Sequence, residues 1–430
     1  MTQNNQTLVD EKHIPKGYKK TEVGVIPSDW DVKKLGDISS IYSGGTPNRK
    51  VGEYWGGLIP WVTTTLINGG EIKEAQEYIT SKGYENSSAK WCEKETILMA
   101  MYGQGKTRGK VGKLVFGATI NQACAAIKVD DKYNVNYILS FLNSKYEAIR
   151  DLSNAGGQEN LSGNIVKSIS ILIPSLNEQQ KIASALSDTD ALISELEKLI
   201  EKKQAIKTAT MQQLLTGKTR LPEFALREDS TSKGYKDSEL GQIPEDWEVK
   251  KLGELVEITS GESPSKFNFV NDGIPYFKVE QLNNGNFYAE STPYSVKLGK
   301  TILAGSLIFP KRGASILSNK IRILKVNACM DTNLMALSCS HELNPNYLLY
   351  SLSYGGLDKV ADTTSIPQIN NKHILPYKIF YPSVSEQIAI SSILVDLENE
   401  IELSQQKIEK LRKIKLGMMQ ELLTGKTRLV

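Results

Sequence analysis

Two long stretches of the chain, 176–216 and 384–425, carry hydrophobic residues at helical spacing. Neither contains proline, and the repeating positions alternate at intervals of three and four residues, as the seam of a coiled coil requires. A helix of about 37 residues would be roughly 55 Å long at 1.5 Å per residue. The seam of the first stretch comprises Leu186, Thr189, Ile193, Leu196, Ile200, Lys203, Lys207, Thr210 and Leu214. The seam of the second comprises Leu394, Leu397, Ile401, Ser404, Ile408, Leu411, Lys415, Met418 and Leu422.

Polar residues interrupt both seams, so neither helix has a complete hydrophobic stripe of its own. This favours two helices that pack on each other or on a partner. The alternative is two separate amphipathic helices, each lying on its own domain. The length favours an exposed pair, because helices in globular proteins average about 11–12 residues. Both stretches end at a repeated LLTGK, where Gly217 and Gly425 occupy the expected position of a glycine cap.

The rest of the chain has short apolar runs bounded by glycine, asparagine or lysine, such as TILMAMYG, KLVFGATI, SLIFPKRG and IRILKV. These runs are typical of strands in an α+β domain. Residues 217–240 are polar and contain Pro222, which predicts a linker. The segment 1–20 is interpreted as an N-terminal tail whose first dozen residues are disordered.

The chain is an internal duplication. Residues 17–47 and 234–264 are identical at 18 of 31 positions, and 172–221 and 380–429 at 24 of 50. About 120 residues between these anchors have diverged. With a period above 200 residues and two copies, this is a duplicated module and not a solenoid. Similar terminal segments around diverged central segments indicate two sites that have the same function and act on different targets.

Composition narrows the class of protein. The chain has 430 residues, 40% hydrophobic and 23% charged, which is typical of a soluble globular protein. No apolar run approaches the roughly 18 residues of a membrane span, and the polar start lacks a signal-peptide core, so we expect a cytoplasmic protein without membrane contact. The four cysteines show no CxxC spacing and the three histidines are scattered, so we expect neither a metal site nor disulfides.

Each segment that resembles a catalytic or cofactor-binding motif lacks a residue that the motif requires. Gly105-Lys106-Thr107 resembles the end of a phosphate-binding loop, but the required earlier glycine is Ala100. Gly103-Gln104-Gly105 lacks the third glycine of a dinucleotide motif. The segment 344–347, Asn-Pro-Asn-Tyr, resembles the catalytic loop of adenine methyltransferases but lacks its second proline. We therefore expect no catalytic residue and no metal ligand in this chain.

Charge placement points to nucleic acid. Residues 96–129 contain no acid and carry +5, and residues 291–330 contain no acid and carry +7, at matching places in the two halves. Such segments suit a phosphate backbone, and arginine or lysine can also contact guanine. The alternative is that some of these lysines merely solvate strand edges. The predicted contacts in these windows are Lys106, Arg108, Lys110, Lys113, Lys311, Arg312, Lys320 and Arg322.

Two further segments, 59–70 and 274–286, align at an offset of 215. They offer Thr63, Thr64 and Lys278 as base-reading candidates, with Asn68, Gln281 and Asn283 as weaker ones. The aromatic residues near them and in the repeated N-terminal motif are interpreted as core, namely Trp61, Tyr276, Trp30 and Trp247.

The duplicated order of three motifs resembles the specificity subunit of type I restriction–modification enzymes. The motifs are IPxDWxVKKLG (26–36, 243–253), PSxxEQ (174–179, 382–387) and LLTGKTR (214–220, 422–428), and the resemblance runs from about residue 17 to the end. It implies an α+β fold in which two α/β target-recognition domains, related by a pseudo-twofold repeat, are separated by two long antiparallel coiled-coil helices. Carried over, the recognition domains are 21–175 and 241–382, and the helices 176–216 and 384–425.

The resemblance also implies partners and cofactors. The chain would be a non-catalytic subunit that reads a bipartite, gapped double-stranded DNA target and directs two modification subunits and the restriction subunits. S-adenosylmethionine, ATP and Mg would belong to those partners and not to this chain. Two rival classes are a self-sufficient methyltransferase or restriction enzyme, which would transfer methyl groups unaided, and a protein-only scaffold, which salt-dependent DNA binding by the complex would exclude.

Overall fold

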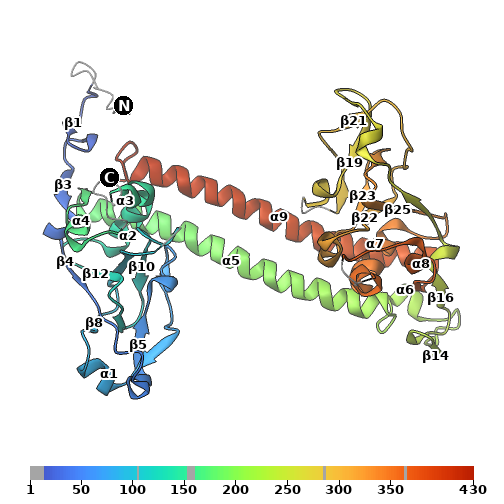
Figure 1. Ribbon diagram of the computed structural model, residues 1–430, viewed down its shortest axis with the longest axis horizontal. Helices are drawn as coiled ribbons and strands as arrows, with labels where there is room; N and C mark the ends of the chain where they lie inside the picture. Colours follow the sequence, from blue (N-terminus) through green and yellow to red (C-terminus); the bar gives the residue numbers. More distant parts are fainter. Residues whose placement is uncertain (1–13, 104–105, 153–159, 284–286, 363–365) are drawn as a thin grey trace. The chain divides into compact units, whose positions relative to one another are not determined.

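The computed structural model describes residues 14–103, 106–152, 160–283, 287–362 and 366–430. The chain divides into two compact units, Met1–Glu195 with Ile408–Val430, and Leu196–Lys407. Each unit contains one mixed α/β domain and segments of both long helices, α5 (Leu176–Leu215) and α9 (Val384–Leu422) (Figure 1). Each long helix therefore begins in one unit and ends in the other.

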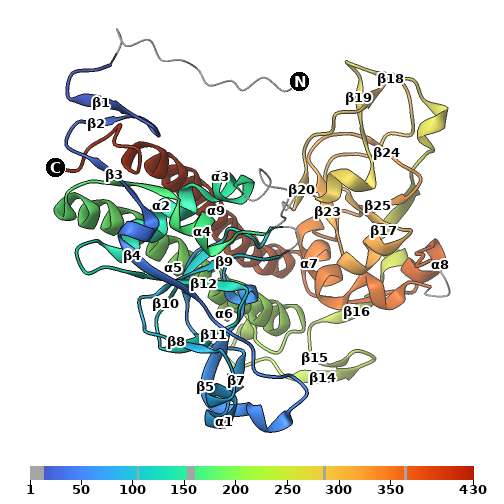
Figure 2. The same cartoon turned by 60° about the vertical axis from the view of Figure 1, so that its left-hand side comes forward.

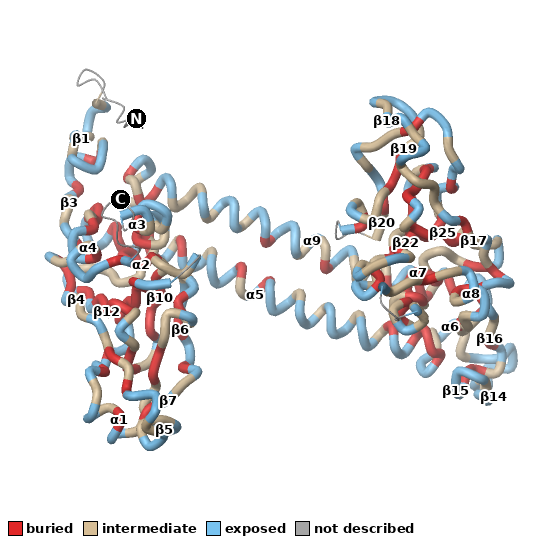
Figure 3. Tube along the Cα trace, viewed as in Figure 1, coloured by how far each residue is buried: buried red, intermediate tan, exposed pale blue. Residues whose placement is uncertain are grey.

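The two long helices are antiparallel in both units (Figure 2). In the first unit Lys415 Nζ lies 2.5 Å from Asp190 Oδ1, and in the second Lys203 Nζ lies 2.6 Å from Glu400 Oε2. Residue numbers therefore rise along α5 as they fall along α9. Every position of the two predicted seams is buried or half-buried, whereas most intervening positions are exposed (Figure 3). The prediction of paired helices is confirmed, and the alternative of two separate amphipathic helices is wrong.

Each domain is built on the same pair of sheets, although their sequences have diverged. The five-stranded sheet has the order β4-β12-β9-β10-β6 in the first domain and β17-β25-β22-β23-β20 in the second. The strands of the first are β4 (Ser39–Ser43), β12 (Cys124–Val129), β9 (Ile97–Ala100), β10 (Val111–Leu114) and β6 (Glu71–Ile72). Those of the second are β17 (Val256–Ser260), β25 (Leu334–Cys339), β22 (Leu307–Pro310), β23 (Arg322–Leu324) and β20 (Tyr288–Ala289).

The smaller, four-stranded sheets correspond in three of their strands. β5 in the first domain and β19 in the second each pair antiparallel with one neighbour and parallel with the other, and the fourth strand lies at opposite edges of the two sheets. The first sheet, β7-β5-β11-β8, comprises β7 (Glu77–Ile79), β5 (Trp55–Val62), β11 (Ala118–Ile120) and β8 (Lys90–Cys92). The second, β18-β21-β19-β24, comprises β18 (Phe269–Val270), β21 (Ser295–Val296), β19 (Ile274–Phe277) and β24 (Cys329–Met330). The four apolar runs singled out in the sequence form strands, as predicted.

Among the described residues, the domains also contain four two-stranded ladders and several short helices. The ladders are β1 (Tyr18–Thr21) with β2 (Gly24–Pro27), β3 (Asp31–Lys34) with β13 (Ser170–Ile173), β14 (Tyr235–Ser238) with β15 (Gly241–Pro244), and β16 (Glu248–Lys251) with β26 (Lys378–Tyr381). The shorter α-helices are α1 (Ser81–Glu85), α2 (Val135–Ser144), α3 (Tyr146–Asp151), α4 (Gly163–Lys167), α6 (Pro222–Ala225), α7 (Pro345–Gly355) and α8 (Asn371–Ile374). The tryptophans and tyrosines predicted as core, Trp30, Trp61, Trp247 and Tyr276, are buried.

The three repeated motifs meet at one cluster in each unit, which we call the arginine junction. In the first unit, Glu178 at the start of α5 accepts hydrogen bonds from Trp30 Nε1 (3.0 Å) and from Arg428 Nε (2.7 Å). Arg428 also donates to both carboxylate oxygens of Asp29 at 2.8–2.9 Å. Arg428 follows the end of α9, so the last motif of the second module completes the first domain.

The second unit repeats this arrangement with equivalent residues. Glu386 at the start of α9 accepts from Trp247 Nε1 (2.9 Å) and from Arg220 Nε (2.6 Å), and Arg220 also binds Asp246. Arg220 follows the end of α5. Each domain is therefore held by the helix start of its own module and the helix end of the other.

Electrostatics and burial explain the residue types of the junction. The carboxylate of Glu178 is only 2% exposed. Burial alone would raise the pKa of Glu178, but hydrogen bonds from Arg428 and Trp30 outweigh it and hold that pKa below its ordinary value. The forked guanidinium suits this site because it binds two carboxylates at fixed angles.

The glutamine and glycine of the motifs have equally local roles. Gln179 Oε1 accepts from the backbone N–H of Asn134, and Asn134 caps α2 by accepting from Tyr137 N. Gly425 has φ +72°, and a Cβ there would lie 2.5 Å from Pro27 Cδ, so only glycine fits. Asn344 caps α7 in the second unit in the same way as Asn134 caps α2. The segment 344–347 that resembles a methyltransferase loop is therefore the N-terminus of that helix.

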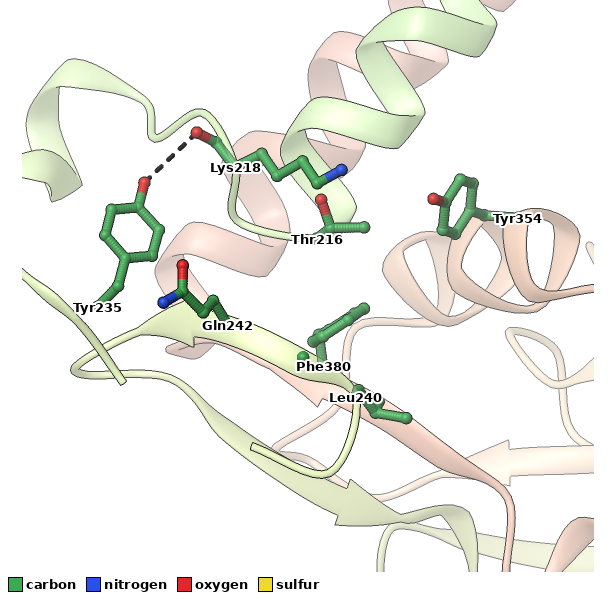
Figure 4. Close-up of a pocket in the computed structure, with 8 residues that line it drawn as sticks. Thr216, Lys218, Tyr235, Leu240, Gln242, Tyr354 and Phe380 are labelled. Atoms are coloured by element: carbon green, nitrogen blue, oxygen red, sulfur yellow. Dashed lines mark hydrogen bonds between the residues drawn. The ribbon is translucent and has the colours of Figure 1, made fainter. Parts of the chain in front are cut away.

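The predicted linker, 217–240, is not a free connection. Tyr235 in β14 donates a hydrogen bond to the carbonyl of Gly217 (3.1 Å), and its hydroxyl also faces the carbonyl of Lys218, as Figure 4 shows. A cavity of about 730 Å³ lies beside this turn, lined in part by Thr216, Gln242 and Tyr354. The segment folds onto the second unit because Arg220 belongs to its junction. The end of the predicted N-terminal tail is also ordered into the domain, because Tyr18 lies in β1 and donates a hydrogen bond to the carbonyl of Gly425. Residues 1–13 of that tail lie outside the described residues.

We expect Arg428→Ala to lower the free energy of unfolding of the first unit by about 2–4 kcal/mol, because it leaves the buried Glu178 carboxylate without its cation. Urea denaturation monitored by circular dichroism measures this. The control is Arg412→Ala, which removes an exposed ion pair with Glu409 on α9 and should change stability by less than about 0.5 kcal/mol. Equal losses in the two variants would contradict the role of the junction.

Candidate nucleic-acid interface

One edge of each domain brings the start of the basic loop next to the strand end that carries the base-reading candidates. In the first domain, Met101 N donates to Ala123 O (2.8 Å), Ala123 N to Asn121 Oδ1 (3.1 Å), and Asn121 N to Val62 O (3.1 Å). These bonds join the start of the basic loop after β9 to the end of β5, next to Thr63. We call this the strand-end edge of the domain.

The second domain has the same ladder at equivalent positions. Lys311 N donates to Asn333 O (2.8 Å), Asn333 N to Asp331 Oδ1 (2.6 Å), and Asp331 N to Phe277 O (2.8 Å). The basic loop after β22 is thereby joined to the end of β19, next to Lys278. The fold thus places the start of each basic loop beside the strand end that carries Thr63 in one domain and Lys278 in the other.

Within the basic loops the side chains differ in exposure. Lys106 and Arg312 are exposed, whereas Arg108, Lys110 and Lys311 are half-buried. Lys311 Nζ donates to Ser260 Oγ (2.9 Å), and burial, followed by the charge of Arg312, lowers its pKa. Exposed cations on loops are available to a phosphate backbone.

Lys113, Lys320 and Arg322 are also engaged by groups within the domains. Lys113 is buried, and its ammonium lies 3.0 Å from Glu95 and 3.7 Å from Glu71, with Asn136 also accepting from it. These acids lie outside the acid-free window of the sequence, and the fold brings them to Lys113. We therefore remove Lys113 from the candidate interface.

Lys320 and Arg322 are likewise held by neighbouring groups. Arg322 donates to the carbonyls of Ile321 (2.9 Å) and Leu282 (3.0 Å), and burial lowers its pKa. Lys320 donates to the side chain of Asn283. Their hydrogen bonds hold Leu282 and Asn283, which gives Lys320 and Arg322 a structural role.

The base-reading candidates lie at the ends of β5 and β19 in the smaller sheets. Thr63 and Thr64 line a pocket of about 540 Å³ at the end of β5, together with Arg49, Gln76 and Asn121. Lys278 lies at the end of β19, with its ammonium 3.5 Å from the ring centre of Tyr294. Four further residues at these strand ends are not among those predicted from the sequence, namely Arg49, Gln76, Asn121 and Tyr294. No motif marks these residues, because strand pairing alone brings them to the edge.

Comparison with known proteins identifies the architecture. A family model described as the type I restriction modification DNA specificity domain matches residues 27–208 and 244–413. The chain belongs to this family. It carries two copies of the domain, as the internal repeat predicts, and it is a DNA-recognition component of a restriction–modification system and not itself the catalyst.

Individual relatives match either nearly the whole chain or somewhat less than half of it. The type I restriction enzyme MjaIX specificity subunit of Methanocaldococcus jannaschii is 28% identical, with 96% of each chain covered. The EcoR124I/EcoR124II specificity subunit of Escherichia coli is 27% identical over 42% of this chain and 44% of its own length. The crystal structure of an S subunit from M. genitalium has a TM-score of 0.58 at 16% identity and covers 91% of this chain and 96% of its own. No helix among the described residues is both long and apolar enough to cross a membrane.

Lys113 and Lys106 should separate stability from DNA contact. We expect Lys113→Ala to lower the free energy of unfolding by about 1–3 kcal/mol, because it leaves a cavity and removes buried hydrogen bonds. Lys106→Ala should leave stability within about 0.5 kcal/mol but reduce the salt dependence of DNA binding by about one counterion. Denaturation and binding titrations at several salt concentrations measure both, and a reduced salt slope in a stable Lys113→Ala protein would contradict this assignment.

Proposed function

We propose that each domain reads one half of a gapped, two-part double-stranded DNA sequence and that the chain directs partner subunits to that sequence. The observation that carries the proposal is the strand-end edge, which is built twice on the same hydrogen-bonded ladder but with different side chains. Two domains that recognise different target sequences require the same backbone frame with different DNA-contacting side chains, as found in the two halves of this chain.

Affinity and selectivity come from different parts of the edge. The exposed Lys106 and Arg312 supply salt-dependent attraction to phosphates, while the strand ends that carry Thr63, Thr64 and Lys278 face the bases. Arg108, Lys110 and Lys311 stand at the base of the same loops and contribute to the positive field.

The partners in this proposal are two modification subunits and, in the complete complex, restriction subunits. S-adenosylmethionine, ATP and Mg act in those partners, in the cytoplasm, where the DNA target lies. This chain contributes the DNA sequence preference and the distance between the two half-sites.

Methylation sequencing of the source genome, with the gene intact and deleted, tests the proposal. We expect adenine methylation to disappear at one gapped, two-part motif and to return when the intact gene is restored. Detection of the modification subunit by mass spectrometry in both strains is the control. If that subunit is present and no motif changes, the proposal fails.

The long helices act as the ruler between the half-sites in this proposal, because each runs without interruption from one unit to the other. Removing 197–203 from α5 and the facing 402–408 from α9 keeps both seams in phase and shortens the pair by about 10 Å. We expect methylation at the native spacing to be lost and any remaining motif to keep both half-sites with a shorter spacer. Methylation at the unchanged spacing in cells that express the shortened protein would contradict the ruler.

A further inference from the structure

The ends of β5 and β19 carry corresponding sites built on one frame. Trp61 donates its ring N–H to the carbonyl of Gly45 (3.0 Å), and Tyr276 donates its hydroxyl to the carbonyl of Glu262 (2.6 Å). Both rings are at most 2% exposed. The frame therefore holds the strand end in the same way in each domain while using different aromatic residues.

A cation lies on aromatic rings at each of these strand ends. The Arg49 guanidinium lies 3.8 Å from the ring centre of Trp55 and 4.8 Å from that of Trp61. The Lys278 ammonium lies 3.5 Å from the ring centre of Tyr294 and 5.1 Å from that of Phe269. Such contacts fix the direction of a long side chain without removing its hydrogen-bond donors.

The residue across the strand pair decides what each cation can do. Trp61 pairs with Glu77, whereas Tyr276 donates its backbone N–H to Tyr294. Glu77 accepts two hydrogen bonds from Arg49, one of them at 3.1 Å, so the charge of Arg49 is compensated within the domain. Tyr294 has no charge, and among the described residues no acid lies within ion-pair distance of Lys278, although Glu280 is near enough for the two charges to interact.

The site at β19 also presents an acceptor. Glu280 accepts hydrogen bonds from Gln281 Nε2 (3.2 Å) and from the hydroxyl of Tyr294 (3.1 Å), so Lys278 and Glu280 contact the same tyrosine, one at its ring and the other at its hydroxyl. Those hydrogen bonds, followed by the charge of Lys278, lower the pKa of Glu280 and keep it ionised. A carboxylate repels phosphate, which argues against a backbone contact here. A G·C pair presents guanine acceptors and a cytosine amino donor in the major groove, which this cation and carboxylate complement.

The pocket at β5 offers neutral groups instead. Thr63, Thr64, Gln76 and Asn121 line it, and its one arginine is paired with Glu77. Asn121 Oδ1 is occupied by the backbone N–H of Ala123, whereas the exposed Gln76 carries both a donor and an acceptor. A glutamine amide pairs with the exposed edge of adenine, and a threonine methyl packs on the thymine methyl.

We infer that the ends of β5 and β19 are the base-reading sites of the two domains, the β19 site taking a G·C pair through Lys278 and Glu280 and the β5 site an A·T pair through Gln76 and the adjoining threonines. This inference rests on the proposed function and adds the residues and the base-pair class. Position 63 in one domain and position 278 in the other are corresponding specificity-determining positions. Each immediately follows the strand, β5 or β19, whose buried aromatic residue is hydrogen-bonded to the domain.

The test uses the chain co-purified with its modification subunits and a set of oligonucleotide duplexes in which each base pair of the native motif is changed in turn. Lys278→Gln should reduce the preference for G·C at one position of one half-site by about 5- to 150-fold and leave the other positions unchanged. The matched control is Lys325→Gln, since Lys325 lies 3.7 Å over the ring of Tyr288 in the same domain, away from the strand end. This control should leave every preference unchanged.

Two further variants make the test independent of one substitution. Glu280→Gln alters an exposed side chain and should relax the preference at the position affected by Lys278→Gln. Gln76→Ala should relax one A·T position in the other half-site. If Lys278→Gln fails to assemble, the preference of the Glu280→Gln complex decides the inference for this domain.

The outcomes separate this inference from the function on which it rests. If the wild-type complex shows no gapped motif, the proposed function fails. If it shows one and the variants weaken all duplexes equally, including unrelated DNA, the side chains contact phosphate and the inference is overturned. Unchanged preferences in Glu280→Gln and Lys278→Gln complexes overturn it as well.

Discussion

The structure depends on a buried carboxylate at the start of each long helix. Glu178 and Glu386 are almost completely buried, and a buried carboxylate is stable only when it is paired and hydrogen-bonded. The arginine that pairs with each comes from the far end of the other long helix. This single requirement therefore connects the two modules, since neither domain is complete until the helix of the other module has reached it. The tryptophan N–H is a second donor to the same carboxylate, and the glycine turn lets the chain approach closely enough for the arginine to reach that carboxylate.

This constraint leaves the strand-end edge free to vary. The junction, the helix caps and the seam are the parts in which the two halves remain similar in sequence, whereas the strand ends carry Thr63 and Arg49 in one domain and Lys278 and Tyr294 in the other. The ladder beneath them consists largely of backbone hydrogen bonds, which do not depend on the identity of the side chains that the edge presents. A new set of reading groups can therefore be accommodated without disturbing the arginine junction.

The sequence was sufficient for the parts that rest on local periodicity. The heptad spacing predicts the buried seam position by position, because a helix turns spacing directly into a face. The charge pattern along the chain does not predict the role of Lys113 correctly. An acid-free window carries no information about Glu71 and Glu95, which the fold brings to that lysine. Arg49 and Glu77 were missed for the same reason, because they lie 28 residues apart and meet only through the fold around β5 and β7. The three motifs were found, but their meeting point was not, since it joins residues 250 positions apart.

Under the proposed function, the division between the junction and the edge lets one chain combine affinity with selectivity. Exposed cations such as Lys106 and Arg312 attract any phosphate backbone, and that attraction alone would hold the chain on unrelated DNA. Selectivity needs groups whose hydrogen bonds are satisfied by one base pair and left unsatisfied by another, because an unpaired buried donor or acceptor costs about 1–3 kcal/mol. The carboxylate of Glu280 beside Lys278 meets this requirement, since it weakens contact with phosphate and leaves the base pair as the favourable partner. In this proposal, two base-reading sites joined by helices of constant length multiply their selectivity only when both half-sites are present at the right distance.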